Sequence, residues 1–167
     1  AQNRAKKCRL YCSMKRIRYT PPNTTWFVSN RCFQAQYLFR PDQEMTTRFG
    51  YWLGRSLRVY PGIRLIAAVQ MSNHFHFVLK DTNSELSRFL CYFEAHLATS
   101  TNKHRKRSGP VFHQRFAASA VLNEEALHDR ILYTAMNPIN AGLVRIPEQW
   151  PGVNLFPKST EQNIPFR

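Results

Sequence analysis

The spacing of hydrophobic positions changes several times along the chain, between the period of a strand and that of a helix. Stretches rich in β-branched and aromatic residues predict strands at 25–32, 63–69 and 74–80. The short connection 71–73 joins the last two of these into a hairpin. A further strand is predicted over residues 112–122, with a bend inside it. The pattern therefore predicts four strands.

Hydrophobic residues at helical spacing predict three helices, over 42 to about 60, 84 to about 102, and 123 to about 136. Ser84 is the predicted N-cap of the second helix. The third helix is expected to end near residue 136, because the residue before Pro138 avoids the α region. The predicted core-facing positions are Met45, Phe49, Trp52, Leu53 and Ser56 in the first helix and Leu86, Phe89, Leu90, Phe93 and Leu97 in the second.

The resulting order of elements is βαββαβ, followed by a helix. This order favours a ferredoxin-like α+β fold, an antiparallel sheet with helices on one face plus a C-terminal helix. No internal repeat or second domain is evident, so residues 1–167 are interpreted as one domain. Within it we expect a basic N-terminal segment at 1–22, a core at 24–146 and an irregular tail at 147–167.

Two histidines and one tyrosine supply the candidate chemistry. His74 and His76 are two positions apart in a predicted strand, so both side chains point to the same face of the sheet. Two imidazoles on one face can bind a divalent cation, which can polarise a phosphate. Tyr133 lies on the predicted third helix and could attack that phosphate and stay covalently attached.

Composition narrows the class of protein. No apolar stretch reaches the roughly 20 residues that a membrane-spanning helix needs. The four cysteines are too few and too scattered for a disulfide framework, which suits a reducing compartment. The first residues lack the hydrophobic region of a signal peptide, so cytoplasmic localisation is expected. Because residue 1 is alanine, it stays open whether the chain is part of a longer protein.

The charge predicts a polyanionic partner. The chain has 24 Lys and Arg against 10 Asp and Glu, a net charge of +14. Neutralising phosphates releases counterions, so such an excess favours nucleic acid. Aromatic residues interleaved with the basic N-terminal residues also suit stacking on unpaired bases. The predicted DNA-binding residues are Lys15, Arg16, Arg18, Arg31, Lys103, Arg105, Lys106, Arg107 and Arg115.

Three motifs in order resemble a known group of enzymes. His74-Phe75-His76 resembles the His–hydrophobic–His motif of the HUH endonucleases. The segments Gly-Pro-Val-Phe-His-Gln-Arg-Phe116 and Ile131-Leu-Tyr-Thr-Ala-Met-Asn-Pro-Ile-Asn-Ala-Gly-Leu-Val144 are similar to the single-tyrosine transposases. Within them, the resemblance is to the REP-associated tyrosine transposases, and it spans roughly residues 24–150.

The resemblance implies a metal-dependent enzyme that nicks and joins single-stranded DNA. It implies that His74 and His76 are metal ligands and that Tyr133 is the nucleophile. Asn137, one helical turn after Tyr133, matches the polar residue that completes the metal site in related transposases. It further implies Mg²⁺ or Mn²⁺ as cofactor, a 5′-phosphotyrosine intermediate, and recognition of hairpin DNA.

Several alternatives stay open at this point. A non-catalytic nucleic-acid-binding module on a ferredoxin-like scaffold would need the charge but not His74, His76 and Tyr133 together. A two-histidine phosphoesterase is disfavoured, because none of the other histidines begins the His-x-Ser/Thr element that such an enzyme needs. A domesticated enzyme that cleaves without mobilising itself fits equally well. The choice between monomer and homodimer, with Tyr133 acting in its own or a partner's site, also stays open.

Overall fold

The sheet is the centre of the molecule. The structure is a computed structural model that describes residues 19–157. Five antiparallel strands form one sheet in the order β4-β1-β3-β2-β5. Their bounds are Thr24–Arg31 for β1, Ile63–Gln70 for β2, His74–Asp81 for β3, Ala117–Val121 for β4 and Asn154–Leu155 for β5. The first four strands have the arrangement of a ferredoxin-like α+β fold, as the order of elements predicted.

The predicted hairpin is confirmed. β2 and β3 pair antiparallel over their length, joined by the three residues 71–73. On its other side β3 pairs with β1, with His74 opposite Arg31 and His76 opposite Ser29. β3 is therefore hydrogen-bonded on both edges, which fixes its register and the faces to which its side chains point.

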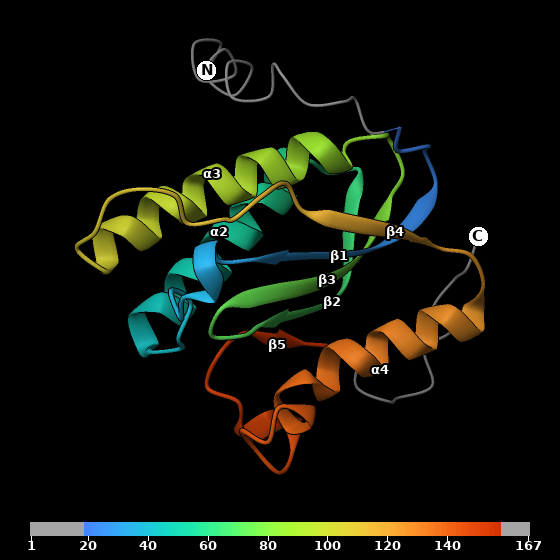
Figure 1. Cartoon of the computed structure of the whole chain (residues 1–167). Coiled ribbons are helices and arrows are strands. Elements are labelled where there is room, and N and C mark those ends of the chain that lie inside the picture. The colour runs from blue at the N-terminus through green and yellow to red at the C-terminus, as the bar shows by residue number, and fades with distance from the viewer. Residues whose placement is uncertain (1–18, 158–167) are drawn as a thin grey trace, which may run out of the picture.

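One face of the sheet is covered by two helices. Figure 1 shows α2 (Gln43–Val59) and α3 (Leu86–His104) together on this side. Phe75 and Phe77 of β3 point into the layer between sheet and helices. There their rings contact Phe49 of α2 and Phe93 of α3, mostly edge to face. Every predicted core-facing position of the two helices is buried except Trp52, which is partly buried.

The third helix, α4 (Glu124–Asn140), lies on the opposite face, below the sheet in Figure 1. A smaller apolar cluster attaches it, in which Leu127 packs with Ala67, Val78 and Val121. The side chain of Asn123 caps its start by accepting from the N–H of Ala126 at 2.8 Å. The helix therefore faces the side of β3 that carries His74 and His76.

The predicted end of this helix near residue 136 is wrong. α4 continues through Pro138 to Asn140 and ends before Gly142, whose φ of +69° is the left-handed value common after helices. Pro138 lacks an N–H, but it lies in the last turn, where it removes only one helical hydrogen bond. Asn154 donates to the carbonyl of Ala135 at 3.1 Å, which gives this end of the helix an outside partner.

The predicted N-cap Ser84 is also wrong. Ser84 has a φ of +56°, and α3 begins at Leu86. The buried carboxylate of Asp81, at the end of β3, accepts instead from the backbone N–H groups of Asn83, Glu85 and Leu86 at 2.9 to 3.1 Å. An acidic side chain at a helix start is favoured by the helix dipole, so Asp81 caps α3 from outside the helix.

β4 is shorter than the predicted strand. It covers Ala117–Val121, and residue 112 makes only an isolated bridge to Cys32. Between this bridge and the pair Ser29–Ala117, residues 113–116 stand opposite only residues 30 and 31. The longer side must bulge out of the sheet, which is the predicted bend.

The chain after residue 147 is not irregular throughout. A 3₁₀ turn over Pro147–Gln149 is followed by β5, which pairs with β2. Trp150 between them is buried, and its indole N–H donates to the carbonyl of Gln70 at 2.7 Å. The part of the tail up to residue 157 therefore completes the sheet edge.

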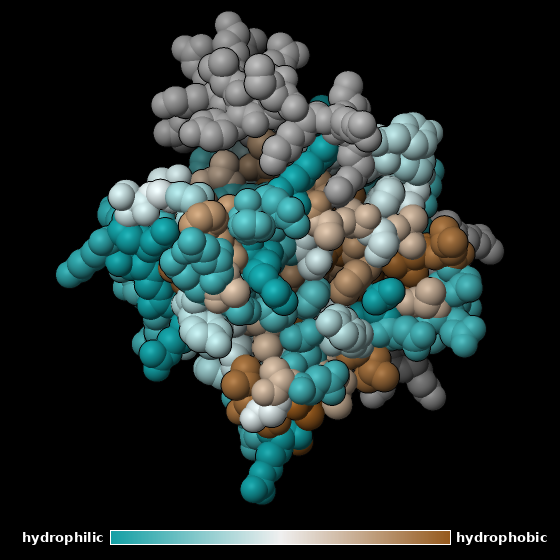
Figure 2. All heavy atoms as spheres, in the orientation of Figure 1, coloured by the Kyte–Doolittle hydropathy of each residue, from teal (hydrophilic) through white to brown (hydrophobic). Residues whose placement is uncertain are grey.

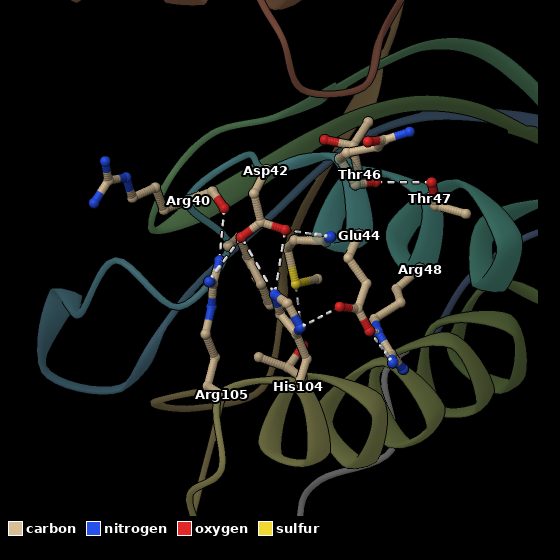
Figure 3. A network of polar contacts seen from close by, with 12 residues as sticks. Arg40, Asp42, Glu44, Thr46, Thr47, Arg48, His104 and Arg105 are labelled. Atoms are coloured by element: carbon tan, nitrogen blue, oxygen red, sulfur yellow. Dashed lines mark hydrogen bonds and ion pairs between the residues drawn. The ribbon is translucent and has the colours of Figure 1, made fainter.

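A polar network joins the start of α2 to the end of α3, and Figure 3 shows it from close by. His104 lies between the carboxylates of Asp42 and Glu44, at 3.2 and 3.1 Å. Arg105 donates to Asp42 at 2.8 Å and to the carbonyls of Leu38 and Arg40. Although burial works to raise it, these hydrogen bonds and that of the Met45 N–H lower the pKa of Asp42 to about 2.

One face of the molecule can be followed in Figure 2. Figure 2 shows hydrophilic residues over most of the visible face, with hydrophobic ones in small separate groups. Of the helices described, none combines the length and the apolar character that crossing a membrane would require.

Candidate active site

The alternation of side chains along β3 builds the site. His74 and His76 point to the α4 face, while Phe75 and Phe77 point to the core on the other face. The two imidazole rings lie 4.9 Å apart, nearly perpendicular to each other. His76 stacks on Phe27 of β1 at 5.2 Å and is buried, whereas His74 is half-buried. The sequence prediction that both histidines share one face is confirmed.

A pocket of about 370 Å³ lies between these strands and α4. Its walls come from the end of β1, the start of β3 and the last turns of α4. The lining residues are Ser29, Asn30, Arg31, His74, His76, Tyr133, Asn137, Asn140 and Ala141. The pocket thus brings together the two histidines, the tyrosine, the asparagine and one of the arginines singled out in the sequence.

The pKa of both imidazoles is lowered, which favours their neutral form. Burial, followed by the charges of His74, Arg31 and Arg130, lowers the pKa of His76 to about 3. Burial also lowers the pKa of His74, helped by Arg31, while a hydrogen bond with Asn137 works in the opposite direction. A neutral imidazole keeps a nitrogen lone pair, so both rings are in the form that can coordinate a metal ion.

Asn73 orients the first histidine, and the sequence analysis did not single it out. Its amide nitrogen donates to the carbonyl of Ala35 at 3.2 Å, so its oxygen faces Nδ1 of His74 at 2.7 Å. An amide oxygen only accepts, so Nδ1 carries the proton and Nε2 of His74 keeps the lone pair. Histidine ligands of metals commonly donate their second ring nitrogen in this way. The position of Asn73 directly before the histidine pair is the sequence feature that could have indicated this role.

The side chains present fit a divalent metal ion. Nδ1 of His76 is buried without a hydrogen-bond partner in the described part of the chain. Asn137 is buried and is the hydrogen-bond partner of His74, so its amide reaches the same place. Within residues 19–157 no group of three or more His, Cys, Asp or Glu is placed to hold a metal. A metal in this pocket would therefore need the amide of Asn137 beside the two imidazoles.

Tyr133 stands at the mouth of the pocket. It lies on α4, is 43% exposed, and its ring is 5.3 Å from that of His76 and 5.8 Å from that of Phe27, both edge to face. Arg130, one turn earlier on α4, places its guanidinium over the ring of Phe27 at 4.8 Å. The phenol is thus accessible from solvent while its ring contacts one of the candidate metal ligands.

The predicted DNA-binding residues fall into separate places. Arg31 is exposed and lines the pocket, and Arg115 lies in the adjoining bulge. The side chains of Arg105 and Arg107 bind carbonyl groups of their own chain, while Lys103 and Lys106 are exposed. The remaining predicted residues, Lys15, Arg16 and Arg18, lie outside the described residues.

Comparison with known proteins supports the fold. No protein-family profile and no curated protein matches the chain. The solved structure of the REP-associated tyrosine transposase bound to a REP hairpin is similar at a TM-score of 0.66 and 17% identity, covering 83% of this chain and 80% of that one. A tRNA(His) guanylyltransferase from Saccharomyces cerevisiae has a TM-score of 0.53 at 16% identity, and the match covers 76% of this chain and 64% of that one. A candidate transposase from Deinococcus radiodurans R1 has a TM-score of 0.48 at 14% identity, covering 74% and 97%.

The chain has a fold similar to that of the transposase bound to a REP hairpin. At such identities the likeness concerns the fold alone, and the guanylyltransferase has a similar fold with a different activity. Any evidence of function therefore lies in the pocket and its side chains.

Proposed function

We propose that the protein is a metal-dependent single-stranded DNA endonuclease and strand transferase with Tyr133 as its nucleophile. The observation that carries this proposal is the meeting of Tyr133, His74, His76 and Asn137 in one pocket. These residues come from two elements far apart in the sequence, β3 and α4, on a fold similar to that of a transposase bound to hairpin DNA. A binding module would not need this combination.

The proposed reaction is a transesterification. The phenol oxygen of Tyr133 attacks the phosphorus of a DNA phosphodiester and loses its proton, and the bond from phosphorus to the 3′-oxygen breaks. The leaving 3′-oxygen takes up a proton, so the products are a 5′-phosphotyrosine and a free 3′-hydroxyl. Attack by another 3′-hydroxyl reverses these steps and joins two strands. No outside energy source is needed, because one phosphodiester replaces another.

Each side chain of the pocket has a role in this scheme. His74, His76 and Asn137 would hold Mg²⁺ or Mn²⁺, which would supply positive charge next to the scissile phosphate. Asn73 keeps the ring of His74 oriented. Arg31, exposed at the rim, binds a phosphate of the strand that enters the pocket. α4 sets Tyr133 over the same pocket, so the attacking group and the phosphate are held close together.

Formation of a covalent adduct tests this proposal. Labelled single-stranded oligonucleotides that carry hairpins are incubated with Mn²⁺ and either the wild type or Tyr133→Phe, then separated on denaturing protein gels. We expect a labelled protein band with the wild type that disappears with chelator and is absent with Tyr133→Phe. Tyr51→Phe, a change of an exposed tyrosine on α2, is the matched control and should keep the band. A random-sequence pool that yields no band at any Mn²⁺ concentration would contradict the proposal and favour a binding module.

A further inference from the structure

A second pocket lies beside the first. Its volume is about 510 Å³, within the range of roughly 300–1,000 Å³ that is usual for ligand sites. It opens where residues 113–116 bulge out of the sheet next to the end of β1. Its walls include the end of β1 together with Gln34, His113, Gln114 and Arg115. None of the roles assigned so far uses this cavity.

The two pockets adjoin each other. Both are lined by Ser29, Asn30 and Arg31, so the end of β1 forms the ridge between them. Asn30 is buried below this ridge, where its amide donates to Glu94 at 2.8 Å and to the carbonyl of Gln114 at 3.1 Å. Its oxygen accepts from the N–H of Arg31 at 2.8 Å. The ridge is therefore rigidly tied to both α3 and the bulge, and it carries an exposed arginine on top.

The wall opposite the bulge is a strained turn. Gln34 and Ala35 both have a positive φ, at 52° and 55°, although neither is a glycine. Non-glycine residues in this region are strained and persist only where the surroundings hold them. Asn73 holds the carbonyl of Ala35, and the same side chain orients His74. The turn presents the exposed side chain of Gln34 to the second pocket.

The chemistry of the lining suits a nucleotide. Arg31 and Arg115 supply positive charge, and His113 supplies an aromatic ring. Gln34 and Gln114 are exposed at the pocket, and a carboxamide offers both donors and acceptors to the edge of a base. Within the described residues no carboxylate lines the cavity, which suits a polyanion.

We infer that the second pocket holds the nucleotide next to the scissile phosphate and that Gln34 and Gln114 select its base. This inference rests on the proposed function for its position relative to the cleaved bond. A single strand that places a phosphate in the first pocket crosses the ridge at Arg31, whose guanidinium contacts the backbone there. The next base then lies between the strained turn and the bulge. The pocket thus sets a sequence preference at one position of the DNA.

Selection from a random pool of single-stranded DNA tests the inference without requiring catalysis. All proteins carry Tyr133→Phe, so binding is measured alone. The pocket variant adds Gln34→Ala and Gln114→Ala, and the control adds Gln43→Ala, an exposed glutamine at the start of α2. We expect one position of the enriched sequence to lose its base preference by on the order of 10-fold in the pocket variant, while the other positions and the control stay unchanged. Thermal melting verifies that all three proteins are equally folded.

The outcomes separate the two proposals. An unchanged base preference in the pocket variant overturns the inference, and so does a pool that shows no preferred base at any position. If the preference shifts as expected but the wild type forms no covalent adduct, the pocket binds DNA and the enzymatic proposal fails. If the adduct forms and the preference does not shift, the enzymatic proposal stands without this pocket.

Discussion

Asn73 is the residue through which the metal proposal can be tested most directly. Its amide makes two hydrogen bonds, to Nδ1 of His74 at 2.7 Å and to the carbonyl of Ala35 at 3.2 Å. Asn73→Ala removes both. At a net contribution of about 1 kcal/mol for each hydrogen bond, the free energy of unfolding should fall by about 1–2 kcal/mol. Urea unfolding monitored by tryptophan fluorescence measures this loss.

Asn73→Ala should also weaken the affinity of the protein for a metal ion. Without an acceptor at Nδ1, the ring of His74 can turn and take the other tautomer, which withdraws the lone pair of Nε2 from the pocket. Loss of such an orienting partner typically weakens metal affinity about 10- to 100-fold. Titration of the protein with Mn²⁺, followed by electron paramagnetic resonance of the free ion, measures the dissociation constant without any DNA present.

Two comparison variants sharpen this test. Ser72→Ala alters the same connection but leaves both hydrogen bonds of Asn73 in place, so Mn²⁺ affinity should not change. Asn73→Asp keeps an acceptor for His74 and loses the donor to Ala35, so it should bind Mn²⁺ at least as tightly as the wild type while remaining less stable. The reasoning is refuted if Asn73→Ala binds Mn²⁺ like the wild type, or if Asn73→Asp loses as much affinity as Asn73→Ala.

Three further predictions concern stability, pH and two basic residues that follow α3. Asp81→Ala should lower the free energy of unfolding by about 2–4 kcal/mol, because it leaves three backbone N–H groups without an acceptor; urea unfolding measures this. Burial and nearby positive groups lower the pKa of His76 from 6.5 to about 3. Between these two pH values, His76 therefore binds a proton in the unfolded chain but not in the folded chain. Stability should therefore fall on acidification from about pH 6.5 toward 3, by up to about 1.4 kcal/mol per pH unit for this one group, and His76→Gln should remove that component in unfolding experiments at pH 7 and 5. Arg105→Ala should lower the melting temperature, because the side chain of Arg105 binds Asp42 and two carbonyls. Lys106→Ala should leave the melting temperature unchanged and reduce the salt dependence of DNA binding by about one phosphate contact.

Each of these predictions has an outcome that contradicts it. Unchanged stability of Asp81→Ala would mean that the cap contributes little. An equal pH slope in the wild type and His76→Gln would show that His76 is not held neutral. If Arg105→Ala melts like the wild type but binds DNA more weakly, Arg105 acts at the surface and not within the network of Figure 3.

The sequence predicted best those parts of the fold in which hydrophobic residues recur at the regular spacing of a helix or a strand. The helical stripe from Met45 to Ser56 and the alternation of His74 to Phe77 each mark one buried face, and both faces are buried as expected. The boundaries were less predictable because side chains outside each helix help to stabilise its ends. Asp81 replaces Ser84 as the cap of α3 only because the chain turns back after β3. Near the end of α4, the carbonyl of Ala135 accepts from Asn154, a residue that follows the helix in the chain.

In the candidate site, too, some features could be predicted from the sequence and others could not. The histidine pair and Tyr133 could be found from spacing and motif, since their positions follow from the strand and helix on which they lie. The role of Asn73 could not, because it depends on a carbonyl 38 residues earlier in the chain, at Ala35. The second pocket was equally hidden, since it arises from a difference in length between two paired segments and not from a motif.

The two faces of the sheet carry cores of very different size, and this gives the two halves of the site unequal local stability. β3, which holds the histidines, is paired on both edges and packs on the large phenylalanine cluster. α4, which holds Tyr133, is attached by a much smaller apolar cluster. Segments with fewer buried contacts open at lower free energy, so amide hydrogens of α4 should exchange with solvent well before those of β3. Tyr133, the proposed nucleophile, would then be able to leave and return while the histidines stay in place, which would give a bound strand a way in and out.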